Sequence, residues 1–142
     1  MYKEVINAFG KIYYKIEYKE DLNIVQADWY GFTTEQDLKR AVIAGLQLHE
    51  HTHCPFRLND NTEFTGPWAN AVGWLEKEWL PRAYASGIRY LAHVARPSSF
   101  GEAAGEALQV GKIGSTIEVK IFHNKEDAIQ WLTVKQKATS LS

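Results

Sequence analysis

Residues 56–68 read FRLNDNTEFTGPW, and they predict a short strand, a polar loop and the first turn of an amphipathic helix in direct succession. The strand is Phe56–Asn59, and Asp60, Asn61 and Thr62 begin the loop. Unpaired backbone N–H groups and partial positive charge collect at a helix start, so α/β domains commonly hold ligands or partner loops there. We therefore expect an α/β domain with its contact surface at this junction.

Composition narrows the class of protein. The chain has 142 residues, 45% of them hydrophobic, which suits one globular domain over residues 1–142. A formal net charge of −1 gives no large basic surface, so nucleic acid is not an expected partner. The lone Cys54 cannot form an internal disulfide, the N-terminus has no signal-like apolar run, and no apolar stretch is long enough to span a bilayer. These features predict a cytoplasmic protein without a membrane span.

Alternating and apolar runs predict five strands, and apolar residues at helical spacing predict four helices between and after them. The strands are expected at 11–19, 23–30, 56–59, 88–95 and 117–122. The helix starts are expected at the capping residues Thr33, Thr65 or Gly66, Ser99 and Asn124. The turn between the first two strands is too short for a crossover and favours an antiparallel hairpin, whereas strands joined through helices must be parallel.

The predicted order is therefore ββαβαβαβα, which is an α/β fold with a single mixed sheet. Its core covers about residues 11–134, and the polar tail 135–142 is expected to be frayed. Charged residues alternate with apolar ones in the strands at 11–19 and 117–122. Fully buried strands lack such alternation, so the helices are expected mainly on one face of the sheet.

The element order and the junction at 56–68 resemble the STAS domain, the SpoIIAA-like fold of anti-sigma-factor antagonists, whose wider superfamily includes SEC14-type lipid-binding domains. The likeness covers about residues 11–134. Antagonist proteins carry Asp-Ser-Ser/Thr-Gly at this helix start; here Thr65-Gly66 matches the end of that motif, and Glu63-Phe64 replaces the Asp-Ser pair. The resemblance implies a cytoplasmic regulatory module that binds a protein partner without catalysis, with Thr65 as the phosphoacceptor.

The predicted contact residues lie in or beside the junction. They are Asp60, Asn61, Thr62, Glu63, Thr65, Trp68 and Trp74. Trp74 is included because it falls outside the apolar stripe of its helix, where an exposed aromatic ring suits contact with another chain. A phosphate on Thr65 would lie against the helix N-terminus. The simpler interpretation, which we favour, is that Thr65 is an N-cap.

Three histidines before Cys54 suggest a metal-site alternative. His49, His51 and His53 are alternate residues, and imidazole is a common zinc ligand. However, such near neighbours on one short segment rarely close a tetrahedron without strain. A solvated helix end, whose partial negative charge favours histidine, is the preferred interpretation, so we predict no metal and no cofactor.

Two further alternatives come from a different class of function. A small carrier would hold an apolar or lipid-like ligand in a pocket lined by tryptophans. The candidates for that lining are Trp29, Trp68, Trp74, Trp79 and Trp131. An enzyme would use Asp60, Glu63 and Arg96, but no nucleophile or cofactor motif completes that set, so we predict no catalytic residue. The less covered sheet face, or the Trp74 side of its helix, also offers a surface for a homodimer.

Overall fold

The computed structural model describes residues 1–66 and 69–140. The strands in this part of the chain are β1 (Tyr2–Ile6), β2 (Ile12–Lys19), β3 (Ile24–Gly31), β4 (Phe56–Phe64), β5 (Tyr90–Val94) and β6 (Glu118–Phe122). The α-helices are α1 (Glu35–Thr52), α2 (Val72–Trp74), α3 (Leu80–Ser86), α4 (Phe100–Val110), α5 (Lys112–Thr116) and α6 (Lys125–Ser140). A 3-10 turn, η1 (Ala69–Ala71), and a π-helical turn, η2 (Leu75–Trp79), complete the helix that leads into α3.

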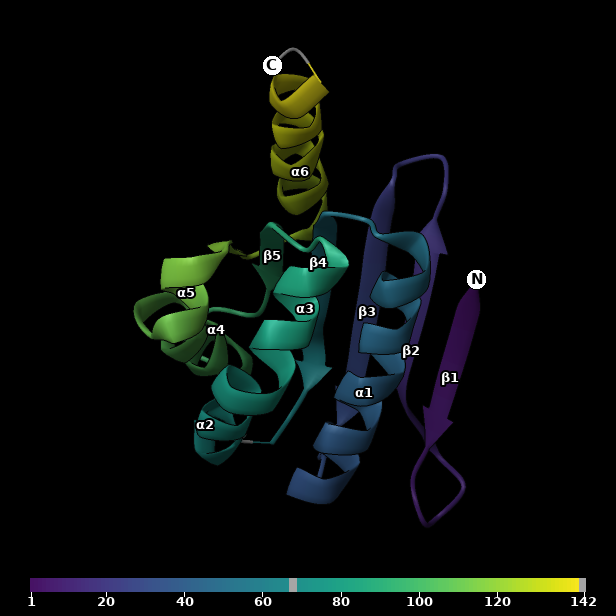
Figure 1. The fold of residues 1–142 in the computed structure, drawn as a ribbon. Helices are drawn as coiled ribbons and strands as arrows, with labels where there is room; N and C mark the ends of the chain where they lie inside the picture. The colour runs from purple at the N-terminus through teal and green to yellow at the C-terminus, as the bar shows by residue number, and fades with distance from the viewer. Residues whose placement is uncertain (67–68, 141–142) are drawn as a thin grey trace.

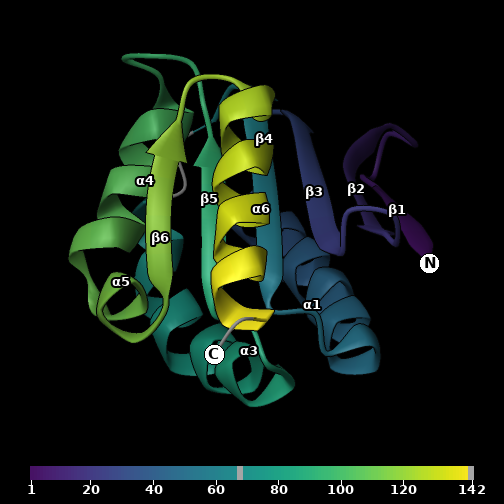
Figure 2. The same ribbon diagram turned by 90° about the horizontal axis from the view of Figure 1, so that it is seen from above.

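The strands form one mixed sheet in which spatial order equals sequence order, from β1 to β6 (Figures 1 and 2). β1, β2 and β3 are antiparallel neighbours, and β3, β4, β5 and β6 are parallel. The short turns join the antiparallel strands, and the helical crossovers join the parallel ones, as chain geometry requires. The predicted α/β class, the antiparallel hairpin and the parallel units that follow it are confirmed.

β1 is an additional antiparallel strand before the first predicted strand, and the sequence pattern did not predict it. β1 is the edge of the sheet, and its residues alternate between exposed and only half-buried. A strand without a buried face carries little apolar periodicity, which explains the omission. The register of β1 against β2 shifts between Val5 and Ile6. Both Tyr13 and Tyr14 are buried next to this irregularity, so the alternation of buried and exposed residues in β2 is broken there.

The helices lie mainly on one face of the sheet, as predicted (Figure 2). α1 to α5 cover one face, and α6 alone lies across β4, β5 and β6 on the other. The Trp131 ring of α6 packs against the rings of Tyr90 and Phe122, with centroid distances of 6.1 and 5.7 Å. The same face of β1 to β3 is not covered by α6 and carries polar side chains such as Lys15, Glu17 and Asp28.

The end of α6 differs from the predicted frayed tail. Residues 135–140 are helical, and the Gln136 amide donates hydrogen bonds to the carbonyl oxygens of Leu22 and Asn23 at 2.8 and 3.2 Å. Lys and Gln are good helix formers, and this contact anchors the helix end on the turn between β2 and β3. Within the described residues, no helix is long and apolar enough to cross a membrane.

Helix caps follow local chemistry closely. Ser99 caps α4 by accepting a hydrogen bond from the Glu102 N–H, as predicted, and Gly87 ends α3 with a left-handed φ of 114°. Pro81 is the second residue of α3, which begins directly after the π-helical turn. The cap of α1 is Thr34 rather than Thr33, which is buried instead.

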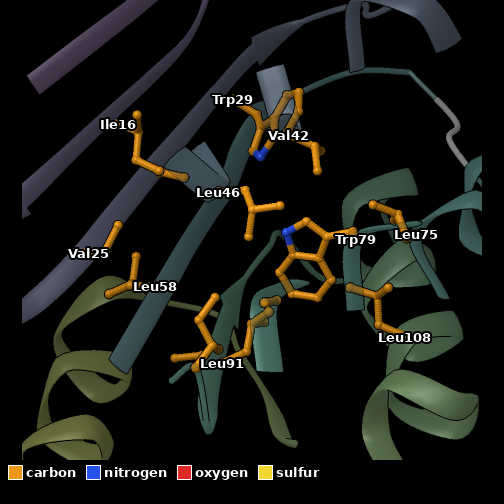
Figure 3. Packing of buried hydrophobic residues seen from close by; sticks show 14 of the residues in the cluster. Ile16, Val25, Trp29, Val42, Leu46, Leu58, Leu75, Trp79, Leu91 and Leu108 are labelled. Atoms are coloured by element: carbon orange, nitrogen blue, oxygen red, sulfur yellow. The ribbon is translucent and has the colours of Figure 1, made fainter. Parts of the chain in front are cut away.

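The main core lies between the sheet and the α1 to α5 layer. Figure 3 shows side chains of β2, β3 and β5 facing side chains of α1, η2 and α4. The labelled members of this core are Ile16, Val25, Trp29, Val42, Leu46, Leu75, Trp79, Leu91 and Leu108. Leu58, which is also labelled, pairs with Gln26 and lies on the opposite face of the sheet, the face that α6 covers. Trp79 is buried in this core, whereas Trp68 lies outside the described residues.

Candidate functional site

The strand before the junction is longer than predicted. β4 continues to Phe64, so Asp60, Asn61, Thr62 and Glu63 belong to a strand end and not to a loop. Its parallel partner β3 continues beside it, and the register shifts once, between Asp28 and Tyr30. The sequence did not predict this extension, because the residues at the end of the strand are mostly polar. Without alternation of apolar and polar residues, a strand cannot be recognised from the sequence pattern. The described helical residues after the junction begin at Ala69, so Thr65 is not the cap of a helix that starts at Gly66.

The Asp60 side chain forms contacts within the end of β4 and with α6. Its carboxylate accepts hydrogen bonds from the Thr62 N–H at 3.0 Å and from the Thr62 hydroxyl at 2.7 Å. It also forms an ion pair with Lys125 at the start of α6, at 3.3 Å. The carboxylate is therefore committed to holding β4 against α6, on the opposite side of the sheet from α4.

Asn61 belongs to a buried network with His93 of β5. The side chain of Asn61 is 3% exposed and that of His93 is not exposed at all. His93 Nε2 lies 2.7 Å from the Gly101 carbonyl of α4, so this nitrogen donates, and Nδ1, 3.3 Å from the Asn61 amide, accepts. Burial lowers the pKa of His93 to about 4, which keeps the ring neutral. This network fixes the start of α4 on the sheet, and neither side chain is available to a partner.

Thr62, Glu63 and Thr65 line a surface hollow of about 580 Å³ at the carboxyl ends of β4 and β5. We call it the carboxyl-edge hollow. Its lining residues are Thr62, Glu63, Phe64, Thr65, Arg96, Ser98, Ser99, Phe100 and Ala103. The crevice outside the carboxyl ends of parallel strands is where open α/β sheets commonly bind ligands.

The side chains around the hollow combine charge with exposed aromatic surface. Arg96 pairs with Glu63 at 3.3 Å, and both side chains are largely exposed. Phe100, the first residue of α4, is 57% exposed in the hollow. Phe32, which is 65% exposed, lies against Gly66, because a Cβ added there would meet its ring at 2.8 Å. Of the predicted cluster of Asp60, Glu63 and Arg96, the structure brings only the last two together.

Trp74 does not project freely. It is half-buried and packs against the core, with the Lys39 ammonium 5.5 Å from its ring centroid. The predicted contact residue Trp68 lies outside the described residues, so its relation to the hollow is not described.

The three histidines near Cys54 have separate partners. His49 is fully buried, and its Nδ1 lies 3.1 Å from the Cys54 carbonyl. His53 Nδ1 lies 3.1 Å from the Ser86 carbonyl, and His51 is exposed on the last turn of α1. Over residues 1–66 and 69–140, no three or more His, Cys, Asp or Glu side chains gather closely enough to hold a metal ion. Burial also raises the pKa of the Cys54 thiol, which disfavours the thiolate that metals need.

Sequence reasoning overlooked Arg57, an inward-facing cation in β4. Its side chain is 4% exposed and borders a small, partly open cavity of about 40 Å³ between the sheet and the helices. The cavity is lined by Trp29, Leu38, Val42, Arg57, Asn59, Asn61, Leu75, Trp79, Leu91, Leu108 and Ile113. Drug-sized ligands need roughly 300 Å³ or more, so this tryptophan-lined space is far smaller than the predicted carrier pocket requires.

The sheet begins with antiparallel strands and continues with parallel strands joined through helices, and the junction lies at the carboxyl ends of the parallel strands. This arrangement defines the SpoIIAA-like α/β fold. The chain is similar to the crystal structure of an uncharacterized protein from the DUF3478 family, from Shewanella loihica PV-4, which has this fold. The TM-score is 0.55 at 20% identity, and the match covers 93% of this chain and 95% of that chain. No model of a protein family matches the chain, and no curated protein matches it. The comparison therefore supports the fold that the sequence resemblance implied.

Proposed function

We propose that this domain is a non-catalytic binding module that contacts a protein partner through the carboxyl-edge hollow. The observation that carries the proposal is the exposed Phe100 ring beside the Glu63–Arg96 pair, in a hollow framed by two strands and a helix. Aromatic and arginine side chains are enriched at protein interfaces, and rigid elements position them at low entropic cost.

The buried titratable groups support a binding role over a catalytic one. Catalytic acids and bases combine a perturbed pKa with a position in a cleft. The two histidines whose pKa values are lowered, His49 and His93, are instead sealed in the interior and do not line the hollow. Their partners are backbone carbonyls, which is the arrangement of structural histidines.

We expect a photo-crosslinking amino acid in place of Phe100 to join the protein to one discrete partner in the cells that produce it. The matched control is the same substitution at Val110, which is 86% exposed at the other end of α4. Crosslinked products are separated and identified by mass spectrometry. An adduct with twice the chain mass would assign the hollow to a homodimer. Equal adduct patterns at both positions, or none at Phe100, would overturn the proposal.

Thr65 is the position where a negative charge would regulate this contact. It is exposed and lines the same hollow as Phe100. We expect Thr65→Glu to reduce the crosslink at position 100 several-fold, because an added charge must be desolvated in the interface. Thr65→Gln has nearly the same size without the charge and should leave the yield unchanged. Equal yields from the two variants would remove Thr65 from the proposed regulation.

A further inference from the structure

β1 is an edge of the sheet with nothing on its outer side. Figures 1 and 2 show no described segment beside it, at the place where the strand order ends. The opposite edge, β6, differs because the Gln109 amide donates a hydrogen bond to the Val119 carbonyl at 3.1 Å. An open strand edge with unpaired backbone groups is a template for pairing with another chain. β1 is therefore the edge at which a further strand can join the sheet.

The outward backbone groups of β1 belong to every second residue. The Met1 carbonyl accepts a hydrogen bond from the Tyr18 N–H at 3.0 Å. Bonded and non-bonded pairs alternate along antiparallel strands, so the odd-numbered residues of β1 bond to β2. The residues whose N–H and C=O groups point outward are therefore Tyr2, Glu4 and Ile6. Arg40 of α1 donates to the Ile6 carbonyl at 2.7 Å, but no described side chain bonds to the outward groups of the other two residues.

The three outward residues are spaced symmetrically about Glu4. A second copy of β1, laid antiparallel beside the first, therefore places Glu4 opposite Glu4 and Tyr2 opposite Ile6. All three side chains stay on the face that α6 leaves open, whereas Lys3 lies on the other face and donates to Gln47 of α1 at 2.9 Å. A shift by one residue would mix the two faces, and a shift by two would leave one outward residue of each copy unpaired.

The same register covers apolar side chains that a single chain leaves in water. Tyr2 and Ile6 are each 51% exposed, and Ile12, the β2 partner of Ile6, is 39% exposed. In the paired edge, Tyr2 of each copy lies against Ile6 of the other copy, with Ile12 on the next strand. Pairs of aromatic and β-branched residues across antiparallel strands stabilise a sheet. A second copy therefore gives β1 an apolar contact at each end.

The charges at the centre of this register balance. Two Glu4 carboxylates meet at the twofold axis, and like charges directly opposite each other destabilise a strand pair. Lys15 of β2 is opposite Glu4 within each chain, so each carboxylate has an ammonium group on its other side. The row across the four strands is therefore Lys15, Glu4, Glu4 and Lys15, and it carries no net charge.

We propose that two copies of this chain associate through antiparallel pairing of β1 with β1, centred on Glu4, so that their sheets form one continuous sheet. The contact is made mainly by one strand of five residues, so it is small and the dimer is reversible. No residue of β1 or β2 lines the carboxyl-edge hollow. The dimer is therefore independent of the proposed partner contact.

Disulfide trapping measures this register directly. Glu4→Cys places two thiols opposite each other at the axis, with Cα atoms about 5.5 Å apart, which a disulfide can span. Tyr2→Cys is the matched control, because its two thiols are separated by roughly 14 Å along the strands. With oxidised glutathione, we expect about tenfold more disulfide-linked dimer from Glu4→Cys than from Tyr2→Cys on a non-reducing gel. The wild type reports any contribution of the buried Cys54.

A second set of variants tests whether backbone pairing holds the contact. Tyr2→Cys combined with Ile6→Cys places thiols opposite each other at both ends of the strand and should restore the disulfide-linked dimer. Addition of Glu4→Pro removes an N–H that points away from β2, so it should reduce that dimer several-fold and leave the circular dichroism of the fold unchanged. Equal dimer yields from Glu4→Cys and Tyr2→Cys, no dimer from Glu4→Cys, or an unchanged yield with Glu4→Pro would overturn the proposal.

Discussion

Substitution of Gly45 by alanine is expected to lower the free energy of unfolding by about 2–4 kcal/mol, although alanine is the better helix former. Gly45 lies in the middle of α1, where the helix crosses β2. A Cβ at this position would collide with the Tyr14 hydroxyl and would lie only 2.8 Å from Cδ1 of Ile16. Both side chains are fully buried, so the helix itself must move away from the sheet.

The Tyr14 ring has no free direction in which to yield. It packs against Trp29 with a centroid distance of 4.5 Å, and its hydroxyl accepts a hydrogen bond from Arg57. Displacing the ring breaks that bond and leaves Nη2 of this buried guanidinium unpaired, in addition to Nη1, which is buried and makes no hydrogen bond. Hydrogen bonds to charged groups contribute about 1.5–3 kcal/mol, which adds to the cost of overpacking. Urea-induced unfolding followed by tryptophan fluorescence measures the total.

Gly73→Ala is the matched control for this prediction. Gly73 is also helical, in α2, but a Cβ there would meet nothing within 4 Å. Its replacement should leave stability unchanged or raise it by up to about 1 kcal/mol. The double variant Gly45→Ala with Tyr14→Phe should lose less stability than the two single variants add up to, because the phenyl ring no longer carries the clashing oxygen. Additive losses, or similar effects at the two glycines, would contradict the packing argument.

The parts of the fold that could be predicted from the sequence are those that local chemistry determines. The alternation of apolar and polar residues in 11–19 predicts β2, because one side of that strand is buried under α1. Ser99 and Gly87 mark helix ends because a hydroxyl cap and a left-handed glycine satisfy backbone groups within a few residues. Short and helical connections then fix which strands are antiparallel and which are parallel. No tertiary contact is needed for any of these steps.

The structure of the candidate site depends on contacts between residues that are far apart in the sequence. Local sequence patterns do not predict such contacts. Asp60 and Lys125 lie on separate elements, and so do Asn61 and His93. A sequence pattern shows that each is polar, but it does not show that Asp60 is held by an ion pair or that Asn61 is sealed in the core. Arg57 was passed over for the same reason. One charged residue in a short strand gives no sign of which face it occupies, and its partner Tyr14 is 43 residues away.

Mild acid is expected to destabilise the protein because two histidines are buried in their neutral form. Desolvation lowers the pKa of His93 from 6.5 to about 4, and that of His49 falls well below its usual value for the same reason, with the charge of Arg57 adding to the effect. In the unfolded chain both rings take up a proton near pH 6.5, whereas the folded protein excludes it. The stability is therefore fully present above pH 6.5 and is lost as the pH falls toward 4.

The size of the loss in the free energy of unfolding follows from the number of protons that the unfolded chain binds and the folded protein does not. For His93 alone the difference between pH 6.5 and 4 corresponds to about 3 kcal/mol, and His49 contributes in the same direction. Between pH 6 and 5 His93 alone gives a slope of about 1.2 kcal/mol per pH unit, His49 adds to it in the same direction, and most carboxylates remain ionised there. Urea unfolding at closely spaced pH values gives this slope directly.

His93→Gln separates the histidine effect from every other acid effect. The Gln amide can still donate to the Gly101 carbonyl, the bond that holds α4 on the sheet, but it takes up no proton. The variant should be less stable at pH 7, because the ring also fills the space above Gly105, where an added Cβ would come within 2.5 Å of it. Its stability should nevertheless fall less steeply between pH 6 and 5. A slope equal to that of the wild type would show that His93 is protonated in the folded state, and the buried network with Asn61 would then have to be rebuilt around a charged ring.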